Sequence, residues 1–147
     1  MTSETVARSA PAEIYEQWLV PSKFEALTGR LLATLQPRSG IRVLDVACGT
    51  GIVARRIAGV VGPSGSVTGL DLNPAMIDVA RTTAERTGLG IHWHTGRAES
   101  LPFADASFDL VVCQQGLQFT VDKRAAVGEM RRVLAPGGSV AVSVWQG

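Results

Sequence analysis

The sequence predicts an α/β fold in which helices cover both faces of a mostly parallel β-sheet. Helix-type and strand-type segments alternate along most of the chain, as they do where crossover helices connect parallel strands. The expected strands are rich in β-branched and aliphatic residues, which suits strands buried on both faces. A glycine-rich turn over residues 47–51 follows the first strand and precedes a helix.

Composition places the chain among ordinary globular domains. It has 147 residues, 46% of them hydrophobic and 18% charged, so a single folded domain is expected and a disordered chain is excluded. The formal net charge is +1 and there is no basic run, so neither nucleic acid nor membrane lipid is an expected partner. Residues 1–4 lack the basic start of a secretory signal, which makes a cytoplasmic protein the expectation.

An N-terminal helical cap segment, residues 1–38, is expected ahead of a cofactor-binding part, residues 39–147. Two amphipathic segments, 11–19 and 23–35, are separated by Pro21 and are expected to pack on the sheet or over its site. Tyr15 is the candidate for a lid residue. Trp18 and Phe24 either line a site or belong to the core.

Five strands and three further helices are expected after the cap. Asn73 is suited to cap a helix whose first position is Pro74, and Gly88 is suited to end it. Gly62 and Pro63 end the helix before it. The expected strands cover residues 41–47, 66–72, 91–95, 108–113 and 139–145, and the helices cover 50–61, 74–87 and 122–134.

The turn after the first strand is expected to bind a ligand. Glycines between a buried strand and a helix let a ligand approach the backbone where a side chain would block it. Asp71 lies about twenty residues beyond Gly51, at a strand end where a carboxylate can accept hydrogen bonds from both hydroxyls of a ribose. An adenosine-type cofactor is therefore predicted. Taken alone, the spacing of Gly49, Gly51 and Ala54 also fits the dinucleotide fingerprint.

The chain resembles the class I S-adenosylmethionine-dependent methyltransferases, specifically the small-molecule branch that includes the ubiquinone/menaquinone-type enzymes. The segments that match this family's motifs in order and spacing are residues 43–51, 69–74, 96–103, 108–112 and 132–138. The resemblance implies a Rossmann-like doubly wound sheet, S-adenosyl-L-methionine as cofactor, and in-line methyl transfer to a small-molecule acceptor. A nicotinamide-dependent oxidoreductase is the alternative, disfavoured by Asp45 ahead of the glycines and by the later motifs.

The resemblance also implies where the methionine and ribose parts of the cofactor would lie. Ala47, Gly49 and Gly51 would line the methionine portion, and Asp45 would hold its ammonium group directly or through water. Asp71 would bind the ribose hydroxyls.

Further residues are implied for the adenine and for the reacting end. Leu72 would pack on the adenine, whose amino edge would be met around Ala98 and Glu99. Gln114 and Gln115 would face the sulfonium and the acceptor.

The sequence departs from the family's pattern at two positions. Ala47 stands where the motif has its first glycine, and Arg97 stands where the family commonly has an aspartate that contacts adenine. The adenine contact is therefore expected from the backbone or from Glu99. No catalytic residue is predicted, because no side chain can be named as a general base.

Several reactive side chains are expected to be structural. Cys48, inside the cofactor turn, is a small spacer, and with Cys113 it forms no disulfide or zinc pattern. His92 and His94 share a strand face, but no further ligand is evident nearby, so no metal is expected. Asp109 is expected to bond backbone amides. The arginine pairs at 55–56 and 131–132 are expected on solvated helix faces.

The resembled family usually continues beyond the fifth strand with a helix and two antiparallel strands, whereas this sequence ends at Gly147. The expectation is a truncated form, or self-association through the edge of that strand, which carries Val140, Val142, Val144 and Trp145. A third reading of function follows, namely a cofactor-binding or interaction fragment without turnover.

Overall fold

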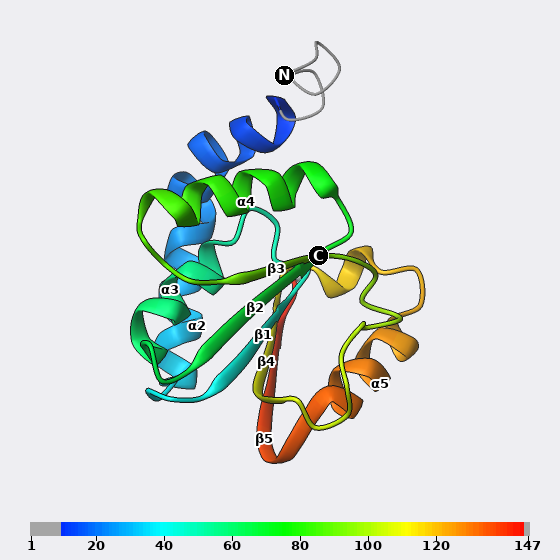
Figure 1. Cartoon of the computed structure of the whole chain (residues 1–147). Coiled ribbons are helices and arrows are strands. Elements are labelled where there is room, and N and C mark those ends of the chain that lie inside the picture. The colour runs from blue at the N-terminus through cyan, green and yellow to red at the C-terminus, as the bar shows by residue number, and fades with distance from the viewer. Residues whose placement is uncertain (1–9, 146–147) are drawn as a thin grey trace.

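A computed structural model describes residues 10–145, so the first nine residues of the expected cap segment and residues 146–147 lie outside the described part. It contains a five-stranded sheet in the order β3-β2-β1-β4-β5 (Figure 1). Every neighbouring pair of strands is parallel, which confirms the predicted fold class. The strands are β1 (Arg42–Val46), β2 (Ser66–Asp71), β3 (His92–Thr95), β4 (Phe108–Gln114) and β5 (Leu134–Ser143).

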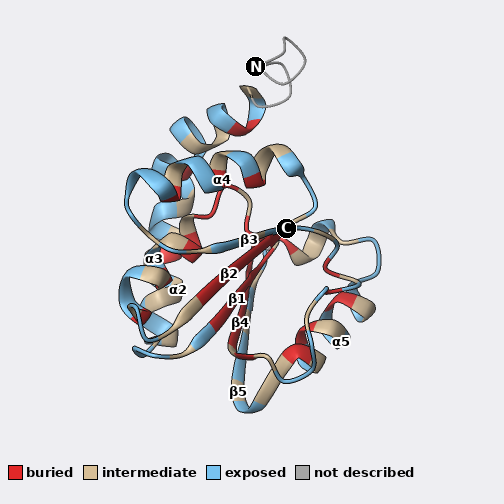
Figure 2. Cartoon of the chain, in the orientation of Figure 1, coloured by how far each residue is buried: buried red, intermediate tan, exposed pale blue. Residues whose placement is uncertain are grey.

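Both faces of the sheet are buried under helices. On one face, α2 (Glu25–Leu35) and α3 (Ile52–Val61) cover a cluster that includes Val43 and Val112, and α4 (Pro74–Arg86) lies over β2 and β3. On the other face, α5 (Lys123–Val133) covers Leu44 and Val111. Figure 2 shows buried residues along the central strands and on the inner sides of these helices. Neighbouring residues of β1 thus enter opposite clusters, as the pleat of a central strand requires.

Side-chain caps fix two of the helix starts. The Asn73 side chain accepts a hydrogen bond from the Ala75 N–H at 3.0 Å, with Pro74 at the first position of α4, as predicted. Asp122 caps α5 by accepting from the Ala125 N–H at 3.0 Å. Within residues 10–145 no helix combines the length and apolarity needed to cross a membrane.

The expected break at Pro21 is wrong. Residues 10–14 are helical, and the chain continues through η1 (Tyr15–Phe24), a π-helical segment, directly into α2. The backbone N–H of Glu25 bonds to the carbonyl of Val20, five residues earlier, so the turns are wider than in an α-helix. The Ser22 hydroxyl donates to the Trp18 carbonyl at 2.5 Å. The wider turns carry the helix past a proline that has no N–H to donate.

The last strand starts earlier than expected, at Leu134 rather than at residue 139. Phe108 pairs with Leu134, and after an irregularity Leu110 pairs with Ser139. The glycine-rich stretch between them therefore lies inside the strand as a bulge, where Gly137 has a φ of +79°.

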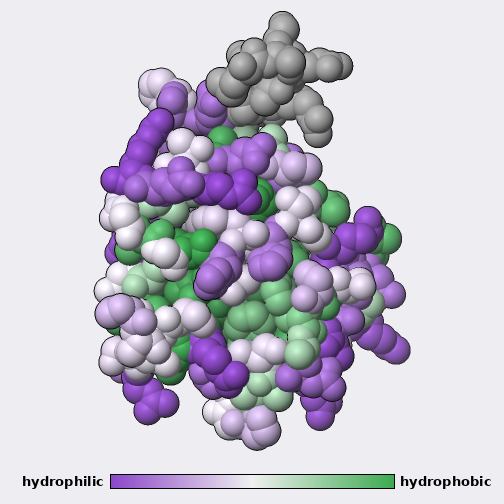
Figure 3. All heavy atoms as spheres, viewed as in Figure 1, coloured by the Kyte–Doolittle hydropathy of each residue, from purple (hydrophilic) through white to green (hydrophobic). Residues whose placement is uncertain are grey.

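The outer edge of β5 pairs with no strand in the part of the chain that the structure describes. The side chains of Val140 and Val142, and of Val144 and Trp145 just beyond the strand, are 41–47% exposed. Figure 3 shows hydrophobic residues reaching the surface between hydrophilic ones on one face of the molecule.

Candidate functional site

A cavity of about 460 Å³ lies at the carboxyl ends of the central strands. The order of the sheet reverses between β1 and β4, and in open α/β sheets ligands bind at this point, outside the carboxyl ends of the strands. The walls come from loops that follow β1, β2, β3 and β4 and from η1. The lining includes residues 47, 49, 70–73, 96–99, 114–116 and 119–121, with Tyr15, Leu19, Lys23, Phe24, Met76 and Trp145.

The turn after β1 presents its backbone to this cavity. Ala47 and Gly49 line it, and both have a φ of +56°, a conformation that an alanine adopts only at some cost. The Cys48 N–H donates to the Leu70 carbonyl at 3.0 Å, which fastens the turn to β2.

Asp71 lines the cavity beside this turn, as the spacing predicted. Its Oδ2 accepts the backbone N–H of Gly49 at 2.9 Å, and its Oδ1 accepts the N–H of Asn73, also at 2.9 Å. A carboxylate has about four lone-pair sites, so each oxygen keeps capacity for a ligand hydroxyl. The two backbone hydrogen bonds therefore orient the carboxylate and leave acceptor sites free on both oxygens.

The cavity lining does not include Asp45, Cys48 or Gly51. Asp45 is 1% exposed and its Oδ2 accepts the Ala54 N–H at 3.1 Å, at the start of α3. Burial raises the pKa of Asp45 to about 8. A Cβ on Gly51 would lie 2.4 Å from the Trp93 ring, and Cys48 is buried next to Gly69. In the structure these residues pack behind the cavity wall and support the turn, and the contacts of Asp45 and Gly51 with a ligand stay a prediction.

The residues predicted to surround an adenine line the cavity. Leu72 is largely exposed there, next to Ala98 and Glu99. Glu99 Oε1 accepts the Val121 N–H at 2.9 Å. A hydrogen bond from its own backbone amide, helped by the bond from Val121, lowers the pKa of Glu99. The Nε of Arg97, the residue that departs from the family's pattern, lies 3.8 Å from Glu99 Oε2. Its positive charge therefore offsets the negative charge of the Glu99 carboxylate.

Two glutamines form the floor at the end of β4. Gln114 is buried, and its Nε2 donates to the hydroxyl of Thr28 on α2 at 2.9 Å. Its Oε1 has no hydrogen-bond partner among residues 10–145. The Gln115 Nε2 lies 3.5 Å from the Ser143 hydroxyl on β5. These contacts join the end of β4 to α2 and to β5.

The helix η1 covers the cavity from above the turn. The Tyr15 ring lies over Gly49, with atoms 3.7–3.9 Å from the position a Cβ would take, and it packs against Phe24 at 5.2 Å between centroids. Burial, with help from the Asp71 charge, raises the pKa of Tyr15 to about 12. Phe24 lines the cavity, whereas Trp18 is 70% exposed and does not. Lys23 Nζ lies 4.3 Å from the centre of the Trp145 ring at the mouth.

One of the arginines expected on a solvated face, Arg55, holds η1 in place. Its Nη2 pairs with Glu16 Oε1 at 2.6 Å, and its Nη1 donates to the Thr50 carbonyl at 2.6 Å. The Thr50 hydroxyl bonds the other oxygen of Glu16. No sequence signal identified Glu16, because its partners are more than thirty residues away.

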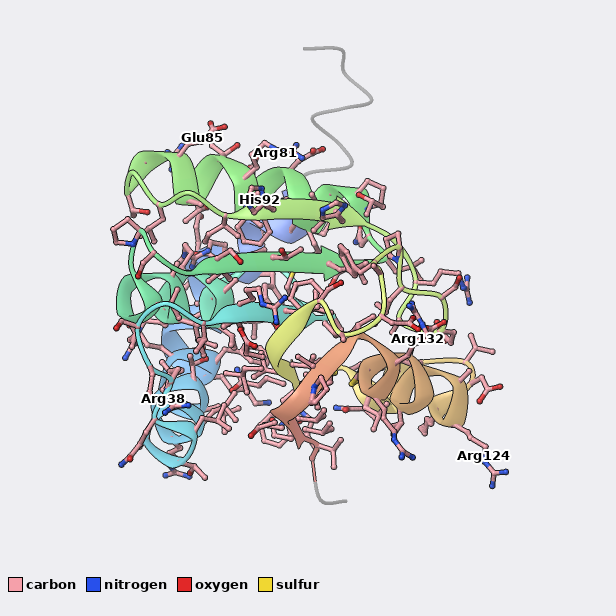
Figure 4. All side chains as sticks on the ribbon, turned by 60° about the horizontal axis from the view of Figure 1, so that its bottom comes forward. Arg38, Arg81, Glu85, His92, Arg124 and Arg132 are labelled. Atoms are coloured by element: carbon pink, nitrogen blue, oxygen red, sulfur yellow. The ribbon has the colours of Figure 1, made fainter. Side chains whose placement is uncertain are left out.

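Arg132 also differs from the expectation that it lies on a solvated helix face. Its guanidinium donates to the carbonyls of Leu101 at 3.0 Å and Phe103 at 2.8 Å and pairs with Asp105 at 2.8 Å. The side chain thus holds the loop before β4 against α5 (Figure 4). The neighbouring Arg131 remains exposed, as expected.

The remaining structural expectations concern residues away from the cavity. Asp109 Oδ2 accepts the Arg42 N–H at 2.8 Å, which confirms its backbone-bonding role. Figure 4 shows His92 on β3 beneath Arg81 and Glu85 of α4. No group of three or more potential metal ligands occurs among residues 10–145.

Comparison with protein families and curated proteins gives a consistent result. A family model described as a methyltransferase domain matches residues 43–138. The ubiquinone/menaquinone biosynthesis C-methyltransferase UbiE of Hahella chejuensis is 44% identical over 107 residues, covering 71% of this chain and 43% of that protein. The chain therefore spans less than half the length of this curated relative.

Solved structures share the fold. The YcgJ protein of Bacillus subtilis is 33% identical, with a TM-score of 0.72 over 78% of this chain and 48% of that one. A SAM-dependent methyltransferase of Aquifex aeolicus is 22% identical, with a TM-score of 0.75 over 86% of this chain and 73% of that one. These likenesses agree with the parallel sheet and its helical layers.

Proposed function

The chain belongs to the methyltransferase domain family, and on that premise we propose that it binds S-adenosyl-L-methionine and transfers the methyl group to a small-molecule acceptor. The observation that carries the proposal is the pairing of Asp71 with the backbone of Gly49 at the edge of a cavity large enough for a ligand. Family membership argues against the nicotinamide alternative, which rested on the glycine spacing and on Asp71.

The residues present fit this cofactor. We propose that the backbone at Ala47 and Gly49 borders the methionine portion and that Asp71 accepts hydrogen bonds from the ribose hydroxyls. Leu72 packs on the adenine face, and Glu99 with the backbone at Ala98 meets its edge. Behind them, the buried carboxyl of Asp45 shapes the turn through Ala54.

The bound cofactor supplies an electrophilic methyl group on a sulfonium, so the protein need only orient an acceptor in line and exclude water. Tyr15, Phe24 and Leu19 form an apolar cover for this purpose. Gln114, fixed by Thr28, forms the floor where the acceptor would approach. Burial raises the pKa of Tyr15 to about 12, so its phenol keeps its proton at neutral pH and is available to donate a hydrogen bond to a ligand.

We propose an apolar acceptor. The mouth of the cavity includes exposed Phe119 and Val121, which suit an aromatic or hydrophobic molecule. The UbiE relative is a C-methyltransferase of ubiquinone and menaquinone biosynthesis, which supports the same class of acceptor.

Calorimetric titration with S-adenosylmethionine, S-adenosylhomocysteine and NAD tests the cofactor assignment. We expect the two sulfur compounds to bind and NAD to give no heat of binding. Binding of NAD alone, or of none of the three, would contradict the proposal. A chain that binds the cofactor but methylates no member of an aromatic acceptor panel would instead be the fragment without turnover.

A further inference from the structure

We propose that Glu16 is a positioning residue that fixes Tyr15 over Gly49 and thereby completes the part of the cavity that receives the amino-acid end of the cofactor. This inference rests on the proposed function. It adds to the residues that shape the site one residue of η1, Glu16, and its two partners, Thr50 in the turn after β1 and Arg55 on α3.

The Glu16 carboxylate is held at both oxygens. Oε1 pairs with the Arg55 guanidinium at 2.6 Å and Oε2 accepts the Thr50 hydroxyl. Arg55 in turn donates to the carbonyl of Thr50 at 2.6 Å, which closes a three-residue cluster. The side chains of Arg55 and Glu16 are only 11% and 18% exposed, so removal of the negative charge leaves a poorly solvated arginine without its partner.

This cluster includes Thr50 of the glycine turn after β1 and therefore adjoins Gly49. Thr50 and Arg55 flank the start of α3, one residue and a few residues after Gly49. The neighbour of Glu16 in η1 is Tyr15, whose ring lies over that same glycine. Tyr15 and Glu16 are consecutive residues of η1, so their side chains keep a fixed angle to each other and anchoring Glu16 to α3 sets the direction of Tyr15.

The position of Tyr15 defines what it can contact. Its ring borders the cavity at Gly49, where the proposed function puts the methionine portion of the cofactor. A phenol that keeps its proton can donate a hydrogen bond to a carboxylate, a group that the amino-acid end of the cofactor carries and its adenosine part lacks. Displacement of Tyr15 should therefore affect only ligands that carry the amino-acid end.

A second ion pair in the same helical layer provides a matched control. Glu25 at the start of α2 pairs with Arg56 of α3 at 3.4 Å, but both side chains are about half exposed and neither residue lines the cavity. Replacement of Glu25 removes the same charge from the same side of the fold without touching Tyr15.

The test compares two ligands that differ in the amino-acid end. Dissociation constants for S-adenosylhomocysteine and for 5′-methylthioadenosine, which retains the adenosine and the sulfur, are measured by calorimetry for the wild type, Glu16→Gln and Glu25→Gln. We expect Glu16→Gln to weaken S-adenosylhomocysteine binding about tenfold and 5′-methylthioadenosine binding less than about twofold. Glu25→Gln should change neither.

A double-variant cycle separates positioning from general destabilisation. If Glu16 acts through Tyr15, the affinity of Glu16→Gln/Tyr15→Phe for S-adenosylhomocysteine should equal that of the weaker single variant instead of showing the product of both losses. Thr50→Val, which removes one of the two contacts and keeps the ion pair, should give a smaller loss of the same selectivity.

Equal weakening of both ligands by Glu16→Gln, or additive losses in the double variant, would overturn the positioning role while leaving the proposed function intact. Wild-type protein that binds neither ligand would overturn the proposed function and this inference with it.

Discussion

The backbone N–H of Gly49 donates to Asp71 Oδ2 at 2.9 Å, which joins the turn after β1 to the end of β2 across 22 positions of sequence. The other carboxylate oxygen accepts the N–H of Asn73, the residue that caps α4. One side chain thus links the glycine turn, a strand end and a helix start. Its orientation is set before any ligand arrives, so a ligand hydroxyl meets a preformed acceptor.

Asp71→Ala is predicted to weaken binding of S-adenosylhomocysteine by at least about tenfold, because hydrogen bonds to a charged group are lost together with the tie to Gly49. Asp78→Ala, on an exposed part of α4, is the control and should leave the affinity unchanged. Calorimetric titration of both variants checks this. An unchanged affinity of Asp71→Ala would show that the ribose is bound elsewhere.

Asp45→Asn is predicted to gain stability relative to the wild type as pH rises. Burial raises the pKa of Asp45 from 3.8 to about 8, so the folded state favours the protonated carboxyl and the wild type loses stability between those pH values. An asparagine at this position still offers an oxygen to the Ala54 N–H and cannot ionise. Denaturant unfolding of both proteins at about pH 5 and about pH 8 measures the difference. A difference in unfolding free energy that is the same at both pH values would refute the raised pKa.

Gly69→Ala is predicted to destabilise the fold by about 1–3 kcal/mol, because its Cβ would lie 2.5 Å from the Trp93 ring and force that side chain to move. Gly128→Ala in α5 is the matched control, since a Cβ there meets nothing within 4 Å, and it should stabilise the helix by about 0.5–1 kcal/mol. Urea unfolding compares the two. Equal changes in the free energy of unfolding for the two variants would mean that the Trp93 ring does not pack against Gly69.

We propose that two copies of the chain associate along the exposed edge of β5. Unpaired backbone groups and half-exposed valines on an edge strand favour pairing with another strand. Val142→Lys should convert a dimer at micromolar concentration into a monomer, whereas Val60→Lys, at a similarly exposed position of α3, should not. Sedimentation velocity distinguishes them, and a monomeric wild type would count against association.

Local chemistry made much of the fold predictable. The alternation of strand and helix patterns placed all five strands in order, and Asn73 with Pro74 marked the start of α4. The β5 start was predicted too late because Gly137 and its neighbours look like a loop, whereas pairing of Leu134 with Phe108 makes them a bulge within a strand. Pro21 was misread because a proline is compatible with a helix whose turns are wide enough.

The sequence by itself determined the layered parallel sheet, the glycine turn and the placement of Asp71 at a neighbouring strand end. These features follow from periodicity and from residues that act on their own stretch of backbone. Only the tertiary structure decided that Asp45 faces α3, that Trp93 occupies the space left by Gly51 and Gly69, and that Arg55 is buried against Glu16. An arginine or aspartate looks the same in the sequence whether it is exposed to water or paired with a side chain far away in the chain. The partner is chosen by packing between segments far apart in the chain.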